Sequence, residues 1–403
     1  MAAETAWRSQ VGFADRLQKI QAILAAYQTA HPDCDFSTAQ LEATAIENKA
    51  LEEGTSKEDY IARCEDVINK LSQEAASLVP ETDNLHPLAE DLEFPEDEDS
   101  ECLVPPKTIG PYKKAYYHRE GIFSVVYRAR KLHNGELVAL KVTSPGLMQP
   151  PHNSLREARI LESLQHPNIV TLNKTFRETG GQFVLEFPFL RYQVDELWRE
   201  KKLSPRQIKS CLQDLFAALG YIHSKGIIHR DVKPSNILLK TPDGPAYLTD
   251  FGIAWSPSDK AAEKADEKIT DVGTTAYRPP EILFGDQAYG TTLDMWAAGC
   301  VVAEAVTTTH EQLFDAGPLG SELGLIKSMF TTIGTPNDET WPSAKTVPDW
   351  GKMQFEQYAP RPWKEILPGA SQEACDLVSK LVCYEQTKRP TAVEVLEHPF
   401  LLS

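Results

Sequence analysis

The chain has 403 residues, 41% of them hydrophobic and 25% charged, and a net charge of −17. This composition is ordinary for a soluble globular protein, and the length allows a catalytic domain of about 300 residues with a small additional module. No apolar run reaches the roughly 18 residues that a membrane span needs, and the start of the chain lacks the basic and apolar regions of a secretory signal. The seven cysteines are scattered without a CxxC pair, which predicts reduced thiols in the cytoplasm or nucleus.

The negative charge is concentrated between residues 81 and 106, which contain ten Asp or Glu residues and no Lys or Arg. This acidic, Pro-containing composition predicts a disordered linker over residues 80–108. The chain shows no basic patch of the kind that binds nucleic acid. We therefore expect neither direct nucleic-acid binding nor membrane attachment.

Residues 1–79 predict a bundle of three amphipathic helices. In the first, apolar residues recur at three- and four-residue steps over residues 7–27, with a glycine near the start that delays the first turn. The second helix is expected over residues 38–51. The third is expected from Ser56, whose hydroxyl would cap it while Asp59 takes the reciprocal position.

The order of features from Ile46-Glu47 to Ser56-Lys57-Glu58-Asp59-Tyr60 is similar to the KIX-like domains of transcriptional coactivators. The resemblance implies a groove that binds an amphipathic helix of the kind found in activators. A docking bundle without this role fits the same pattern, and both interpretations stay open.

Strand signals begin at Tyr112 and include a hairpin with an Asn134-Gly135 turn. A helix is expected after Pro151, followed by an apolar strand over residues 183–187. A long helix with an N-cap at Ser204 and a proline in its first turn comes next. These elements predict a small antiparallel sheet followed by a mainly helical region.

The most informative segment covers residues 227–239, where two apolar runs flank a polar loop with Asp231, Lys233 and Asn236. A further strand-like run ends in Asp250. A carboxylate and a carboxamide at adjoining loop ends are hard oxygen ligands suited to Mg²⁺. An Asp beside a Lys suits a hydroxyl that meets a phosphoryl group.

His229-Arg230-Asp231 with Asn236 five residues later, followed by Asp250-Phe251-Gly252, resembles the catalytic loop and the metal-binding loop of eukaryotic protein kinases. The resemblance implies an α+β bilobal kinase fold over residues 109–403, with an antiparallel small lobe, its C-helix and a mainly helical large lobe. It also implies ATP and Mg²⁺ as cofactors. Lys233 is typical of kinases that act on serine and threonine.

The resemblance assigns roles to the polar side chains of these loops. Asp231 would orient the substrate hydroxyl and accept its proton, and Lys233 would neutralise the γ-phosphate. Asn236 and Asp250 would bind Mg²⁺. Phosphoryl transfer needs mainly positioning and charge neutralisation, so this set suffices.

In the small lobe, Lys141 would hold the α- and β-phosphates and pair with Glu157 of the C-helix. Of the three glycines of the Gly-rich loop only Gly121 is present, since Arg119 and Ser124 stand in the other two places, and this departure bears on nucleotide affinity. The residues expected around the nucleotide are Gly121, Val126, Ala139, Lys141, Phe187, Phe189 and Leu190, with Phe187 as the gatekeeper, or Leu185 if the register shifts by two residues.

The activation segment is expected over residues 250–281. Within it, Thr274 and Arg278 resemble the loop that faces the substrate, with Thr274 bonded to Asp231 and Lys233. The residues expected to be structural are Glu281 and Arg389, which would form an ion pair, and Asp294, which would brace the catalytic loop.

Phosphate-responsive kinases of this branch bring three arginines to a phosphate on the activation segment. Arg156 and Arg230 supply two of them, and Trp255 stands in the third place. The phosphothreonine would fall at Ile269, beside Thr270. We hypothesise that this segment needs no activating phosphate and that an acidic side chain faces the two arginines. The acids nearest Thr270 are Asp266, Glu267 and Asp271.

The stretch from Gln312-Leu313-Phe314 to Trp341-Pro342 is similar to the insert region of the CMGC group of kinases. Together with the altered Gly-rich loop and C-helix motif, it most resembles the monomeric fungal kinases that activate cyclin-dependent kinases. The resemblance predicts a serine/threonine kinase of cell-cycle or transcription control in the nucleus or cytoplasm, with a protein substrate such as a cyclin-dependent kinase. It implies either that a cyclin is not required or that the requirement stays open. The alternatives are a pseudokinase scaffold and a transcription-linked interaction protein that docks through its N-terminal bundle.

Overall fold

The computed structural model describes residues 7, 13–31, 36–77, 105–178, 180–317 and 320–402. The chain forms two compact units, residues 1–93 and residues 94–403. None of the helices in the described ranges combines the length and the apolar character of a membrane span.

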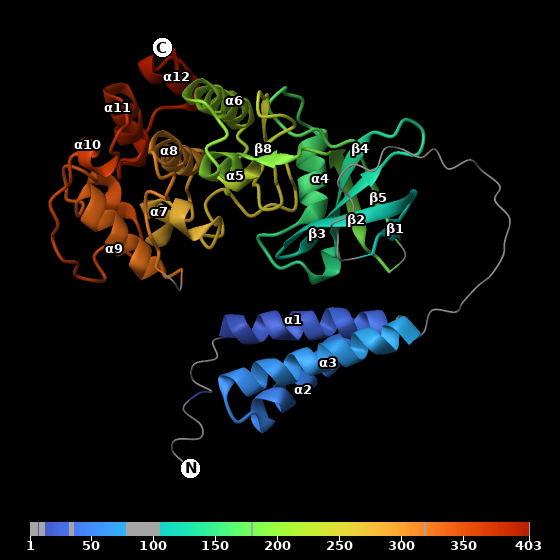
Figure 1. Ribbon diagram of the computed structural model, residues 1–403. Helices are drawn as coiled ribbons and strands as arrows, with labels where there is room; N and C mark the ends of the chain where they lie inside the picture. Colours follow the sequence, from blue (N-terminus) through green and yellow to red (C-terminus); the bar gives the residue numbers. More distant parts are fainter. Residues whose placement is uncertain are drawn as a thin grey trace. The chain divides into compact units, whose positions relative to one another are not determined.

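Within its described residues, the N-terminal unit contains three helices (Figure 1). Their shared core contains Ile23, Tyr60 and Cys64, each at most 1% exposed, and Trp7 at its edge. This agrees with the amphipathic pattern of the sequence, because the apolar face of each helix is buried against the other two. The helices are α1 (Phe13–Ala30), α2 (Phe36–Glu53) and α3 (Lys57–Ser77).

A charged group lies inside this bundle. Glu47 on α2 is fully buried, and its carboxylate accepts hydrogen bonds of 2.8 Å from Nε of Arg16 and from the hydroxyl of Tyr60. A buried carboxylate must be paired in this way to be tolerated. The contact joins all three helices and so specifies how they pack.

The start of α3 differs in detail from the expected capping box. Oγ of Ser56 accepts a hydrogen bond of 3.2 Å from the amide of Asp59, as expected for an N-cap. The carboxylate of Asp59, however, accepts from the amide and the hydroxyl of Thr55, both at 2.9 Å, and not from Ser56. The reciprocal contact is therefore shifted by one residue.

The small lobe of the second unit is a six-stranded antiparallel sheet with the order β1-β2-β3-β4-β6-β5. The first strand includes Lys107 and Thr108, which the sequence had placed at the end of the linker. That boundary was wrong because these residues pair with β2; the rest of the predicted linker before residue 105 lies outside the described residues. The elements are β1 (Lys107–Ile109), β2 (Tyr112–Gly121), β3 (Ser124–Arg130), β4 (Leu137–Thr143), α4 (Ser154–Glu162), β5 (Lys174–Arg177) and β6 (Phe183–Pro188).

Helix α4 is the expected C-helix and stands beside the strands of the small lobe in Figure 1. Its N-cap is Asn153, whose side chain accepts a hydrogen bond of 2.9 Å from the amide of Arg156. Arg156 and Glu157 follow in the first turn, and both are buried.

The large lobe is built mainly of helices around a small sheet with the order β7-β8-β9. The N-cap predicted at Ser204 is present, and the structure adds a reciprocal contact from Gln207 that completes a capping box. Helix α8 is buried along almost its whole length and forms the centre of the lobe. The elements are β7 (Tyr192–Gln193), α5 (Val194–Arg199), α6 (Pro205–Ser224), β8 (Ile237–Leu239), β9 (Ala246–Leu248), α7 (Pro280–Leu283), α8 (Thr292–Val306), α9 (Glu322–Ile333), α10 (Trp363–Ile366), α11 (Gln372–Leu381), α12 (Ala392–Leu396) and α13 (Pro399–Leu402).

Of the two apolar runs that flank the catalytic loop in residues 227–239, the first forms only a single β-bridge and not a strand. The apolar run before the catalytic loop pairs only through Ile228, which exchanges backbone hydrogen bonds with Trp255. The run after the loop is the regular strand β8, which pairs with β9. The loop is therefore anchored on one side by a sheet and on the other by the activation segment.

A buried acid in this lobe makes stability depend on pH. Glu304 on α8 is 7% exposed, and its Oε2 accepts a hydrogen bond of 2.7 Å from the hydroxyl of Tyr277. Burial raises the pKa of the Glu304 carboxyl to about 7. The folded state thus binds this proton more tightly than the unfolded state, in which a Glu has a pKa of about 4.3.

The proton on Glu304 contributes stability that is fully present below about pH 4.3 and is lost as the pH rises through 7. We expect Glu304→Gln, which keeps a carbonyl acceptor for Tyr277, to raise the free energy of unfolding at pH 8 by up to about 3 kcal/mol and to change it little at pH 4.5. Urea denaturation at the two pH values measures this difference. The exposed control Glu311→Gln should leave both values unchanged, and an equal gain at both pH values would contradict the assignment.

Candidate active site

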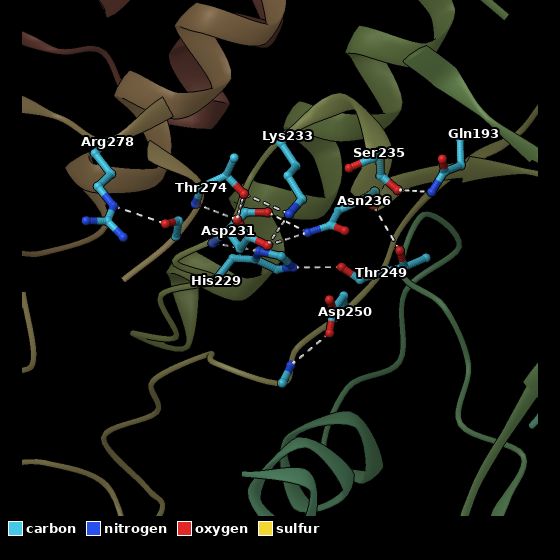
Figure 2. Close-up of polar contacts among 12 residues, drawn as sticks. Gln193, His229, Asp231, Lys233, Ser235, Asn236, Thr249, Asp250, Thr274 and Arg278 are labelled. Carbon is cyan, nitrogen blue, oxygen red and sulfur yellow. Dashed lines mark hydrogen bonds and ion pairs between the residues drawn. The ribbon is translucent and has the colours of Figure 1, made fainter. Parts of the chain in front are cut away.

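Asp231 is the centre of a compact polar cluster, which Figure 2 shows. Its carboxylate lies 2.9 Å from Nζ of Lys233 and accepts hydrogen bonds from the amide and the hydroxyl of Thr274, at 3.0 and 2.9 Å. Nζ of Lys233 also donates to the hydroxyl of Thr274 at 2.7 Å. The sequence placed these three side chains together, and the structure has them within hydrogen-bond distance of one another.

Asn236 is tied to the same carboxylate. Its Nδ2 donates to the backbone oxygen of Asp231 at 2.8 Å and to Oδ2 of the same residue at 3.0 Å. Because the amide nitrogen is used in this way, Oδ1 is the atom that Asn236 can offer to a cation. The arrangement orders the side chain for ligation before any ligand arrives.

Asp294 on α8 holds the backbone of the catalytic loop, residues 229–236, through hydrogen bonds. The fully buried carboxylate of Asp294 accepts hydrogen bonds from the amides of His229 and Arg230 at 2.8 and 2.9 Å. Arg230 has a φ of 72°, a left-handed conformation that costs energy in a non-glycine residue. The two hydrogen bonds to Asp294 hold this conformation and so fix where Asp231 points.

Gly273 allows the substrate-facing loop to approach the catalytic loop closely. A Cβ on this residue, whose φ is 74°, would lie 2.4 Å from the carbonyl oxygen of Arg230. The close approach is what brings Thr274 to Asp231. Arg278, the other residue expected in this loop, donates from Nε to the carbonyl of Gly273 at 3.0 Å and pairs with Asp271 at 2.7 Å.

Lys141 on β4 joins two carboxylates from different parts of the chain. Its Nζ lies 2.7 Å from Oε1 of Glu157 on α4 and 2.8 Å from Oδ1 of Asp250. Burial acts to lower the pKa of Lys141, but the two carboxylates outweigh it and hold the pKa above its usual range. At Asp250, whose carboxylate is about half exposed, the ion pair with Lys141 outweighs the partial loss of solvent and keeps the pKa of that carboxyl well below its usual range. Lys141 and Asp250 are therefore both charged at neutral pH.

The loop after β9 presents Asp250 in a left-handed backbone conformation, with a φ of 63°. The next residue, Phe251, is fully buried and packs edge-on against the ring of His229, with centroids 4.8 Å apart. Nε2 of His229 in turn contacts the carbonyl of Thr249 at 2.9 Å. The buried Phe251 thus anchors the loop, and the half-exposed carboxylate of Asp250 faces outward.

The pairing of β4 with β6 bears on the choice between the two gatekeeper candidates. Leu185 lies opposite Lys141, and Phe187 lies opposite Ala139, two residues nearer the C-terminal end of β6. Leu185 is also fully buried. The register therefore favours Leu185 as the gatekeeper and moves Phe187 to the segment that would meet adenine, with Phe189, which donates its amide to the carbonyl of Leu137 at 3.3 Å.

The remaining residues expected around the nucleotide lie on the same sheet. Val126 on β3 pairs with Lys141, and Gly121 ends β2. Leu190 is buried just after β6. The Gly-rich loop between β2 and β3 thus leads directly into β3, the strand that pairs with β4 at Lys141.

Arg119 at the first glycine position has a partner that the sequence did not predict. Its Nη2 forms an ion pair of 3.0 Å with Oε1 of Glu196 on α5. This contact links the small lobe to the large lobe, and both side chains are partly exposed. No pattern in the sequence signals it, because the partners lie 77 positions apart.

A family model described as protein kinase domain matches residues 119–401. The serine/threonine-protein kinase csk1 of Schizosaccharomyces pombe is 37% identical over 278 residues, which cover 68% of this chain and 89% of that protein. Cyclin-dependent kinase 20 of Rattus norvegicus is 32% identical and covers 70% and 81%, respectively. Among solved structures, a chain of the yeast RNA Pol II CTD kinase CTDK-1 complex has a TM-score of 0.60 at 30% identity and covers 71% of this chain and 95% of that one.

This chain belongs to the protein kinase family. The length of the match and the identities above 30% place the chain among the serine/threonine kinases of the cyclin-dependent-kinase-like group. The bilobal kinase fold expected from the catalytic-loop motif is confirmed, as is the expected group. A protein kinase uses ATP and acts on protein substrates.

Proposed function

We propose that this kinase transfers the γ-phosphoryl group of ATP to a serine or threonine hydroxyl, with Asp231 as the acceptor of the hydroxyl proton. The observation that supports this is the cluster of Asp231, Lys233 and Thr274, in which the carboxylate is held between a cation and a hydroxyl. A substrate hydroxyl that replaced the hydroxyl of Thr274 would lie beside a carboxylate already oriented to accept its proton. Lys233 would then neutralise charge on the transferred group.

The residues present suit a magnesium nucleotide. Oδ1 of Asn236 and the charged carboxylate of Asp250 are hard oxygen donors of the kind that Mg²⁺ prefers when phosphates complete its shell. Bound there, the ion supplies charge neutralisation at the phosphates. Lys141, held by Glu157, would contribute a second positive charge, and Val126, Ala139, Phe187, Phe189 and Leu190 would form the apolar surroundings of the base.

For the substrate, we propose a cyclin-dependent kinase phosphorylated on its activation segment, in cell-cycle or transcription control and in the nucleus. The support is the resemblance to monomeric fungal kinases of this activity and the similarity to csk1 and to cyclin-dependent kinases. We also propose that no cyclin is required, since the pair of Lys141 and Glu157 is formed within the single chain. A solved relative is a kinase of the RNA polymerase II tail, so that tail is the competing substrate.

The test uses the purified full-length chain, without any cyclin, and ATP with Mg²⁺. One reaction contains a catalytically inactive cyclin-dependent kinase and the other a polymerase tail peptide, and phosphorylated residues are mapped by mass spectrometry. We expect a single threonine in the activation segment of the cyclin-dependent kinase to be modified, and its replacement by alanine to abolish the signal. A preference for the tail peptide would replace the proposed substrate by the polymerase.

For the N-terminal bundle, we propose that it docks an amphipathic helix of a partner protein. The amphipathic character of α1, α2 and α3 and the weak KIX-like pattern support this role. Deleting residues 1–80 should leave phosphoryl transfer to a short peptide unchanged while it weakens capture of the partner. Loss of peptide phosphorylation in the deletion variant would argue against a separate docking role.

A further inference from the structure

Three cations are buried where the C-helix, the catalytic loop and the activation segment meet. Arg156 comes from α4, Arg230 from the catalytic loop and Lys268 from the activation segment, and all are at most 4% exposed. Arg230 lies over the ring of Tyr289 at 5.5 Å, and Lys268 lies 5.0 Å from the rings of Tyr289 and Trp255. Such a group of like charges is tolerated only when an anion neutralises it.

The anion that contacts the two arginines is Glu263 of the activation segment. Its Oε1 accepts a hydrogen bond of 3.0 Å from Nη1 of Arg230, and its Oε2 lies 3.7 Å from Nη1 of Arg156. Its backbone carbonyl accepts a hydrogen bond of 2.8 Å from the indole of Trp255, which stands where related kinases have a third arginine. Burial acts to raise the pKa of Glu263, but the arginines outweigh it and hold the pKa below its usual range.

The acids nearest Thr270 are not the partners of the arginines. Glu267 pairs with Lys264 at 2.9 Å, and Asp271 pairs with Arg278 at 2.7 Å. In the described parts of the chain no hydrogen bond joins Thr270 to either arginine. An acidic side chain therefore faces the arginines as the sequence predicts, but it belongs to Glu263, which precedes the acids beside Thr270 in the activation segment.

A second acid ties the same stretch to the same helix. The carboxylate of Asp259 forms two hydrogen bonds with Nη2 of Arg159 on α4, at 2.8 and 3.1 Å. Arg156 and Arg159 are three positions apart and so lie on one face of the helix. Residues 259–263 of the activation segment thus hold this face of the C-helix at two points.

The contact between Glu263 and Arg156 is linked through α4 to Lys141, the lysine that would bind the nucleotide phosphates. Arg156 directly precedes Glu157, whose carboxylate pairs with Lys141 at 2.7 Å. Whatever fixes Arg156 also fixes the rotation of α4 that delivers Glu157. Arg230 likewise precedes Asp231, so Glu263 holds the residues adjacent to both of these carboxylates.

We propose that Glu263 is a positioning residue that takes the place of an activating phosphate. A carboxylate built into the chain bridges the C-helix and the catalytic loop, so the kinase is active without phosphorylation of its activation segment. This inference rests on the proposed kinase activity but not on the identity of its substrate. Glu263 makes these contacts as soon as the chain is folded, without any covalent modification.

The test uses full-length protein made in bacteria, shown by mass spectrometry to be unphosphorylated and assayed on a mixture of serine- and threonine-containing peptides. Glu263→Gln removes the charge and keeps the shape, Glu263→Asp keeps the charge, and Glu267→Gln is the matched control in the same segment. We expect Glu263→Gln to lower kcat by about 10- to 100-fold, as for the loss of a charged hydrogen bond. The melting temperature should also fall, because the buried arginines lose their anion, so kcat is measured at a temperature at which circular dichroism shows the variant to be fully folded. Glu263→Asp should recover part of the loss, and Glu267→Gln and Thr270→Ala should keep wild-type kcat.

Two results would overturn the proposal. One is wild-type kcat in Glu263→Gln. The other is an inert unphosphorylated wild type that becomes active when Thr270 is phosphorylated, which would leave the kinase function intact and remove only the role of Glu263. A protein inert in both phosphorylation states would instead overturn the kinase proposal together with this one.

Discussion

Replacing Asp231 by asparagine is expected to lower kcat by about 100- to 10,000-fold, the range measured for loss of a general base. The carboxylate accepts hydrogen bonds from Thr274 and Asn236 and lies beside the ammonium of Lys233, so it is held in a fixed orientation. An asparagine has nearly the same shape but cannot accept the proton of the substrate hydroxyl. The fold should therefore be retained while the chemical step is lost.

The KM for ATP should change by less than about threefold in Asp231→Asn, because ATP binds in the ground state without help from the carboxylate that accepts the substrate proton. Transfer of radiolabelled phosphate to a peptide measures kcat, and calorimetric titration with the magnesium nucleotide measures binding. Asp338→Asn is the matched control, since its carboxylate is 79% exposed and, among the residues that the structure describes, its ion pair is with Lys345 at the surface. A kcat within tenfold of wild type would show that Asp231 does not act as the base, and loss of nucleotide binding would assign it a different role.

Replacing Arg389 by alanine is expected to lower the free energy of unfolding of the kinase unit by about 3–5 kcal/mol, as for one partner of a buried ion pair. Nη1 and Nη2 of Arg389 bind the two carboxylate oxygens of Glu281 at 2.5 and 2.8 Å, and both side chains are fully buried. Arg389 also donates to the carbonyls of Thr292 and Cys383, both at 3.0 Å. Its removal leaves the buried carboxylate of Glu281 without its cation and takes one donor away from each of the two carbonyls.

Urea denaturation of the Arg389→Ala variant measures this loss, and Arg199→Ala serves as the control. Arg199 also forms an ion pair of 2.5 Å, with Asp195, but its side chain is 63% exposed. Its loss should cost less than about 1 kcal/mol. The double variant Glu281→Gln with Arg389→Met should lose less than the sum of the single losses, because neither partner is then left charged alone. Equal losses at the buried and exposed arginines would contradict the assignment.

Several functional positions follow from short patterns in the sequence. The spacing of His229-Arg230-Asp231 and Asn236 indicates a catalytic loop, because a turn of fixed length sets the distances among its side chains. The N-cap of α6 at Ser204 and the helical periodicity of the N-terminal unit are likewise local. The pairs formed by Lys141 with Glu157 and by Glu281 with Arg389 join distant residues, yet the resemblance to kinases supplied both.

Other features depend on contacts that no local pattern specifies. The register of β4 against β6, which separates Leu185 from Phe187, is set by the lengths of the intervening loops and by packing on both faces of the sheet. Residues 107 and 108 look like linker in composition and become strand only because β2 offers hydrogen bonds. The strand before the catalytic loop is a single bridge because its neighbour, the activation segment, is irregular.

The amino-acid sequence by itself determined the chemistry of this protein: a carboxylate, lysines and oxygen ligands at spacings that a catalytic loop and its neighbouring strands hold together. Only the tertiary structure decided which acid meets the buried arginines and which acid pairs with Arg119. Glu263 and Glu196 belong to no motif, and the segment that carries Glu263 has no periodicity from which its direction could be predicted. Their partners lie 33 and 77 positions away, so their roles appear only when long-range packing brings the segments together.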